Sequence, residues 1–182
     1  GGFLLEKQSP CAYASAMNAT PAVAADATRE FLQRYAPFSG MSATALDFLV
    51  PRLARTEFAQ DGTILATRSG PVTHLHIVER GLVGRRADAM QSAPERTLGP
   101  GELFPVGALS AGGSTTKVFT ALQDTTCLML PRDDFLELRA ASPEFERYCT
   151  EAITETLRQS LDSLYRAALR LTYPGYPLRR IQ

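Results

Sequence analysis

Long apolar runs are missing from this 182-residue sequence, in which no stretch approaches the ~20 apolar residues of a membrane-spanning helix. A surplus of positive charge is missing too: 19 Lys and Arg residues balance 19 Asp and Glu residues, whereas nucleic-acid binding normally needs a basic face. The three cysteines have no CxxC spacing, which argues against a zinc knuckle and a disulfide scaffold. We therefore predict a cytoplasmic protein with no membrane or nucleic-acid partner.

Signatures of an enzyme are also missing. The sequence contains no P-loop, no dinucleotide fingerprint, and no Ser or Cys with a recognisable base partner. The adjacent Asp133 and Asp134 are explained by the start of a helix, where carboxylates cap the chain and oppose the helix dipole. Arg85 and Arg86 are interpreted as part of a solvated hairpin. The sequence predicts no catalytic residue and no enzymatic activity.

The sequence does have enough apolar residues, 45%, to build a core. Residues 1–24 are rich in Ala, Ser, Asn and Pro; we expect them to be mobile and partly non-native, because the first two glycines resemble a cloning remnant. Residues 25–141 form the predicted domain, residues 142–172 a long helix, and residues 173–182 a tail. One domain of ordinary size with an extended helix is therefore expected.

Within the domain, short strand-like segments alternate with turn signals such as Asp61-Gly62 and Gly99-Pro100-Gly101. This pattern is typical of a small β-barrel or jelly-roll. With its flanking helices it predicts an α+β fold, in which an antiparallel β-roll of about eight strands lies between two N-terminal and two C-terminal helices. The strand-like segments are residues 56–59, 63–67, 73–81, 82–87, 96–101, 117–123 and 125–131.

Helix signals precede the roll. Asp26 is placed to cap a first helix that Pro37 stops, because a proline disfavours helical geometry in the residue before it. Ser42 is placed to cap a second helix, which Pro51 bends or ends.

Two further helices follow the roll. A short one is predicted over residues 131–141, and a long one begins with Ser142 as N-cap and Pro143 at the first helical position. Apolar residues then recur at spacings of four and three, over more length than a small barrel needs to cover itself. The stripe either packs only on the chain's own roll or also pairs with its twin in a homodimer. The residues predicted to form the dimer face are Ile153, Leu157, Leu161, Leu164 and Ala168.

The stretch GELFPVGALSAGGSTTKVFTAL, residues 101–122, is the main candidate for a binding site. Its glycines and its Ser-Thr-Thr-Lys run suit an anion held against backbone N–H groups. A second candidate is the pair His74 and His76, which are two apart on a predicted strand and therefore share a face. With Glu79 they are similar to the first metal motif of the cupin family, but the sequence has only two histidines, so a third imidazole has no source.

The order of elements and several spaced motifs resemble the cyclic nucleotide-binding domain family over about residues 26 to 170. The motifs are the entry helix with Pro37, Phe38, Leu46 and Leu49, the Gly62-x-Ile64 turn, IVERGLV with Gly81, GPGELF, and ALQDTTCLMLPRDDF. The resemblance implies a regulatory domain whose phosphate cassette lies at residues 101–122. In the family, a glutamate in this cassette accepts a bond from the ribose hydroxyl and an arginine pairs with the cyclic phosphate.

This chain departs from that cassette. Pro105 replaces the usual glycine, Val106 the glutamate and Thr115 the arginine, so that Lys117 is the nearby positive charge. Losing two charged hydrogen bonds of about 1.5–3 kcal/mol each lowers the affinity for a cyclic nucleotide by roughly two to four decades. The ligand is then a cyclic nucleotide or another phosphate-bearing compound. The candidate ligand-binding residues are Phe104, Pro105, Val106, Gly107, Ala108, Leu109, Ser114, Thr115, Thr116 and Lys117.

The motifs PFSGM, LHIVERGLVGRR and LGPGELFPVGALSAGG are most similar to one branch of the family. Those bacterial signal-transduction proteins combine this domain with CBS and nucleotidyltransferase-like domains. We expect a regulatory mechanism in which ligand in the cassette moves the short helix at residues 131–141, and this helix then changes the angle of the long helix. Two alternatives stay open: a structural dimerisation module that binds no ligand, and a cupin-like metal-binding protein.

Overall fold

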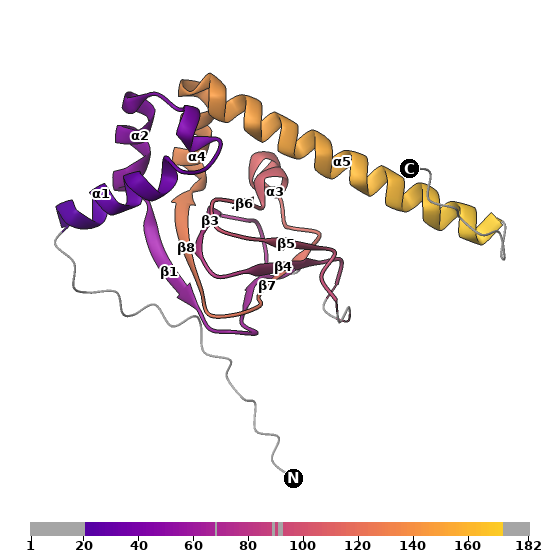
Figure 1. Cartoon of the computed structure of the whole chain (residues 1–182). Helices are drawn as coiled ribbons and strands as arrows, with labels where there is room; N and C mark the ends of the chain where they lie inside the picture. The colour runs from indigo at the N-terminus through magenta and orange to yellow at the C-terminus, as the bar shows by residue number, and fades with distance from the viewer. Residues whose placement is uncertain (1–20, 68, 89, 91–92, 173–182) are drawn as a thin grey trace, which may run out of the picture.

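The computed structural model describes residues 21–67, 69–88, 90 and 93–172. Most of the predicted N-terminal segment, residues 1–20, and the predicted tail, residues 173–182, lie outside this range. The described chain forms an antiparallel β-roll, and the helices that precede and follow it in the sequence gather on one side of it (Figure 1). The predicted α+β class and β-roll are confirmed.

Eight strands of the described chain form two four-stranded antiparallel sheets, ordered β1-β8-β3-β6 and β2-β7-β4-β5. Each of the seven predicted strand segments contains a strand. The prediction missed the two-residue β6, which is too short for an alternating pattern. The strands are β1 (Ala54–Phe58), β2 (Thr63–Leu65), β3 (His74–Arg80), β4 (Val83–Arg86), β5 (Arg96–Leu98), β6 (Leu103–Phe104), β7 (Val118–Ala121) and β8 (Thr125–Pro131).

Alternation along the strands creates two apolar cores. One lies inside the roll and consists of Val78, Val83, Leu98, Phe104, Phe119 and Cys127. The other packs the outer face of the first sheet, with Leu75, Ile77, Leu128 and Leu130, against the helices. Cys127 is fully buried in the core inside the roll, and this burial raises the pKa of its thiol to about 12.

The N-terminal helices agree with the sequence prediction in part. Helix α1 (Pro21–Leu32) begins before Asp26, so the predicted cap is wrong: Asp26 lies within the helix, because the preceding Ala-rich residues are good helix formers. Helix α2 (Ala43–Leu49) has the predicted cap, since the Ala45 N–H donates to Ser42 Oγ at 3.2 Å. A 3₁₀ turn, Val50–Arg52, follows it and contains Pro51, so this proline ends the α-helix rather than bending it.

The C-terminal helices are α4 (Arg132–Ala141) and α5 (Pro143–Thr172). Asp133 and Asp134 lie in the first turn of α4, where the dipole argument placed them. Helix α5 crosses over the short helix α3 (Val106–Ala111) and continues past the strands (Figure 1). No helix in the described part of the chain is both long and apolar enough to cross a membrane.

Candidate functional site

The predicted cassette connects β6 to β7 through helix α3. The Phe104–Pro105 peptide bond is cis, and α3 ends at Gly112, whose φ of 68° suits a residue without a Cβ. The side chains of Phe104, Val106 and Leu109 are buried in the two cores. These predicted site residues shape the cassette from beneath, whereas Ala111 and Gly112 at the end of α3 are exposed.

Thr115, which we predicted to stand at the family's arginine position, uses its hydroxyl locally. Its Oγ accepts from the Lys117 N–H at 3.1 Å and donates to the Lys117 carbonyl at 3.0 Å, and the residue is buried. Thr115 therefore stabilises the turn into β7. Ser114 and Thr116 are exposed beside it, so theirs are the cassette hydroxyls that face solvent.

Lys117 forms an ion pair with Glu95, the residue just before β5. Its Nζ lies 2.9 and 3.1 Å from the two carboxylate oxygens of Glu95. Arg85 of β4 approaches the same carboxylate, with its Nε 3.9 Å from Glu95 Oε2. Two cations thus share one carboxylate beside the cassette.

The interpretation of Arg85 and Arg86 as a solvated hairpin is wrong. The Arg85 side chain is only 15% exposed, and the Nε atoms of both arginines are buried without a hydrogen-bond partner. Arg85 lies two residues after the core residue Val83 and pairs with Phe119, so alternation turns it toward the inside of the roll. That spacing was the available sequence signal. Burial lowers the pKa of the Arg85 guanidinium.

Arg85 also contacts the long helix. One of its terminal nitrogens donates to Gln159 Oε1 of α5 at 3.1 Å. Glu95 and Gln159 are therefore two further residues of the site that the sequence did not predict. Their proximity to Arg85 depends on how the hairpin and α5 pack, which local patterns do not reveal.

The histidine pair does not form a metal site with Glu79. The ring of His76 is buried inside the roll and stacks on Phe104, and burial lowers the pKa of His76 to about 4. The Glu79 carboxylate is engaged by two nitrogens of Arg55, each at 2.6 Å. Among the described residues, no three His, Cys, Asp or Glu side chains are grouped to hold a metal ion.

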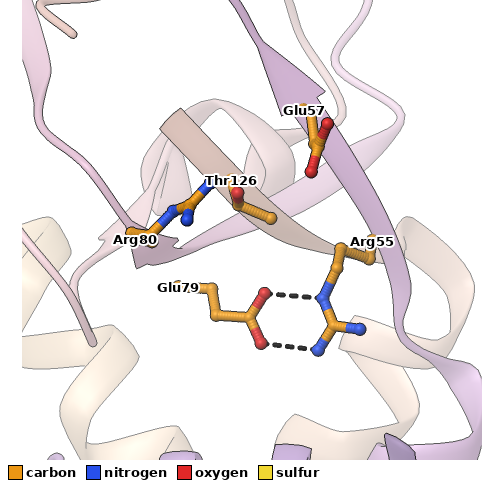
Figure 2. A pocket seen from close by; sticks show the side chains of 5 residues that line it. All are labelled: Arg55, Glu57, Glu79, Arg80 and Thr126. Carbon is orange, nitrogen blue, oxygen red and sulfur yellow. Dashed lines mark hydrogen bonds and ion pairs between the residues drawn. The ribbon is translucent and has the colours of Figure 1, made fainter. Parts of the chain in front are cut away.

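An open hollow of about 430 Å³, shown in Figure 2, is lined by none of the predicted cassette residues. The β1–β8 register places Arg55 opposite Leu128, so the hollow opens on the outer face of the first sheet. Inside it, Arg55 and Glu79 neutralise each other, and Arg55 also reaches the Thr28 hydroxyl of α1 at 3.4 Å. This arrangement attaches α1 to the sheet. The residues lining the hollow are Arg55, Glu57, Glu79, Arg80 and Thr126.

The guanidinium of Arg139 connects the cassette to both C-terminal helices. From α4, it donates to Ser110 Oγ of α3 at 2.9 Å and to both carboxylate oxygens of Glu146 in α5, at 2.5 and 2.8 Å. The hydrogen bond from Arg139 lowers the pKa of Glu146. Near the start of α4, Arg132 Nε donates to the Leu109 carbonyl at 2.9 Å. Helix α3 is therefore bonded directly to α4, and the same Arg139 side chain bonds α4 to α5.

The apolar stripe of α5 divides into two parts. Phe145 and Cys149 are fully buried against the helical core, and Ile153 packs partly against it. Beyond this point Leu157 is 60% exposed and Leu164 67% exposed. The roll therefore covers only the first part of the stripe. The other predicted dimer residues, Leu161 and Ala168, are exposed as well.

Comparisons with known proteins agree on the fold. Residues 56–142 match the family model of the cyclic nucleotide-binding domain. No curated protein sequence matches the chain. The catabolite activator protein of Thermus thermophilus is 26% identical, with a TM-score of 0.61 over 73% of this chain and 63% of that protein. The sensor domain of the transcriptional regulator DNR from Pseudomonas aeruginosa is 12% identical and shares the fold, with a TM-score of 0.63 over 76% of this chain and 93% of that domain. The chain thus spans less than two thirds of the Thermus protein's length.

Proposed function

Because residues 56–142 match the family model of the cyclic nucleotide-binding domain, we propose that the chain is the ligand-sensing domain of a bacterial signal-transduction protein. Domains of this family are typically regulatory modules. The Thermus thermophilus protein to which this chain is similar is a catabolite activator protein. The cassette sequence ELFPVGAL supports the narrower placement in the branch with CBS and nucleotidyltransferase-like domains.

The proposed ligand is a cyclic nucleotide or another small compound that carries a phosphate. Support comes from the positive charge of Lys117 and Arg85 and from the exposed hydroxyls of Ser114 and Thr116. These groups stand in for the family's arginine. Val106 is buried and offers no acceptor for a ribose hydroxyl, so the proposed site selects for the anion more than for the sugar.

The observation that carries the regulatory proposal is the bonding of Arg139. Its bonds to Ser110 and Glu146 join the cassette helix to α4 and α5 through one side chain. A ligand changes the helices only to the extent that it prefers one of their arrangements. Ligand in the cassette is proposed to shift α3, and Arg139 to pass this shift to α5.

The output of the sensor is proposed to be a homodimer formed through α5. The exposed stripe continues at spacings of four and three, the pattern of a two-stranded coiled coil. A structural module that dimerises without binding ligand has the same stripe, so ligand binding is the property that separates the two functions.

Thermal unfolding in the presence of cyclic AMP, cyclic GMP, AMP, ATP and inorganic phosphate tests the proposal. A ligand at ten times its Kd stabilises the folded state by about 1.4 kcal/mol, which raises the Tm by roughly 3–6 °C for a chain of this size. The sensor predicts such a rise with at least one compound. A dimer whose Tm is unchanged by all five compounds at millimolar concentration would instead support the structural module.

A further inference from the structure

Glu95 holds a carboxylate where the cassette's positive charges converge. Arg85 and Phe119 are directly paired on neighbouring strands, and Lys117 precedes Phe119 by two residues. Strand alternation therefore places Arg85 on the inner side of its sheet, while Lys117 lies directly before β7 and reaches the Glu95 carboxylate. Between them, the Glu95 carboxylate lies 2.9 Å from Lys117 Nζ but 3.9 Å from Arg85 Nε. Two positive charges are compensated by one negative charge.

This compensation is incomplete for Arg85. The distance to Glu95 exceeds that of a hydrogen bond, and Arg85 Nε is buried without any partner. A buried donor without an acceptor is costly, so the cluster favours an anion with more oxygens than a carboxylate. A phosphate group has both the additional charge and the additional acceptors, and it binds guanidinium groups through several bonds at once.

We propose that Arg85 and Lys117 together form the anion-binding pair of the cassette, and that Glu95 is an internal counter-ion that a phosphate-bearing ligand displaces. This inference rests on the proposed function. It adds Arg85 as a second cation of the site and Glu95 as a carboxylate that competes with the ligand. Because a ligand must displace the Glu95 carboxylate, weakly charged anions bind with lower affinity. The site therefore selects ligands by their negative charge. The same exchange provides a signal, because Arg85 also holds Gln159 of α5.

The test compares the whole chain with the variant Glu95→Gln, which keeps the size of the side chain and removes its charge. Inorganic phosphate and cyclic AMP are titrated separately by calorimetry. Removing a half-exposed competing charge is expected to tighten phosphate binding about tenfold. The control is Glu57→Gln, which changes the net charge equally on the outer face of the other sheet and is expected to bind phosphate as the unmodified chain does.

A second variant separates the proposed pair from a general charge effect. Adding Lys117→Gln or Arg85→Gln to Glu95→Gln is expected to abolish the gain in phosphate affinity. The inference is overturned if Glu95→Gln binds phosphate no more tightly than Glu57→Gln, or if the gain survives the loss of Lys117. The proposed function fails separately, if the unmodified chain binds neither inorganic phosphate nor any of the nucleotides. The inference alone fails if the unmodified chain binds phosphate and Glu95→Gln brings no gain.

Discussion

The imidazole of His76 stacks on the ring of Phe104, with ring centroids 5.0 Å apart and an interplanar angle of 19°. Phe104 stacks in turn on Phe119 at 4.8 Å, so the histidine is part of the roll's aromatic interior. His76 is 3% exposed and its Nδ1 has no hydrogen-bond partner. The folded chain therefore requires the neutral form of this imidazole.

Because of His76, the folded chain is expected to become less stable as the pH is lowered. Desolvation, with a smaller contribution from His74, lowers its pKa from 6.5 to about 4 in the folded chain. Its contribution is fully present above about pH 6.5 and is lost as the pH falls toward 4, because the unfolded chain binds the proton first. The free energy of unfolding should drop by about 2 kcal/mol between pH 7 and pH 5 from this residue.

Urea denaturation of the variant His76→Phe at both pH values measures this effect. The variant should lose that part of the pH dependence, while His74→Gln, which keeps the buried ring, should retain most of it. An equal fall in stability in the unmodified chain and in His76→Phe would show that other groups cause it.

Tyr35, which follows α1, packs closely against the roll at Gly101, and Gly70 provides a matched control position for testing this contact. Both glycines have a φ of 85°, but a Cβ at Gly101 would lie 2.3 Å from Tyr35 Cγ, whereas a Cβ at Gly70 meets nothing within 4 Å. Gly70→Ala should cost only backbone strain, about 1–2 kcal/mol. Gly101→Ala should cost about 3 kcal/mol or more, because Tyr35 must also move. Chemical denaturation compares them, and equal losses would contradict the close packing of Tyr35.

Helix α5 should mediate dimerisation through its exposed stripe. Leu157→Asp places a charge in the centre of the proposed dimer face and should give a monomer in sedimentation equilibrium at micromolar concentration. Ser163→Asp adds the same charge on another face of the helix and should leave the dimer intact. A monomeric unmodified chain, or a dimeric Leu157→Asp variant, would disprove this interface.

Arg139 should be required for signalling more than for ligand binding. Arg139→Gln removes the paired bonds to Glu146 and the bond to Ser110, with a loss of about 1 kcal/mol because the pair is partly exposed. Ligand should still bind this variant but no longer change hydrogen exchange in α5. Arg158→Gln breaks an exposed pair within α5 and should respond normally. An unchanged α5 response in Arg139→Gln would exclude this route.

Local sequence patterns predicted the roll because its corners need special residues. Asp61 and Gly81 have φ values of 64° and 95°, a left-handed geometry that the turn signals indicated. The long helix was predicted because Ser142 and Pro143 mark its start, and the Phe145 N–H does donate to Ser142 Oγ, at 3.4 Å. These features depend on neighbours in sequence.

The site was less predictable because it depends on packing between distant segments. Lys117 was identified as a candidate, but its partner Glu95 is brought to it by the hairpin after β4. Arg85 was misassigned because two adjacent arginines usually indicate solvent, whereas the strand directs the first one inward and α5 supplies a bond acceptor in Gln159. Only the folded chain brings these residues together.

Calorimetric titration with cyclic AMP tests most directly whether the cassette binds a phosphate-bearing ligand. We expect saturable binding to the unmodified chain that Lys117→Ala weakens at least tenfold, because the ligand loses a charged hydrogen bond. Thr116→Val should weaken it less. Absence of binding by cyclic AMP, and then by cyclic GMP, AMP, ATP and phosphate at millimolar concentration, would contradict the claim and leave the stripe of α5 as the functional surface.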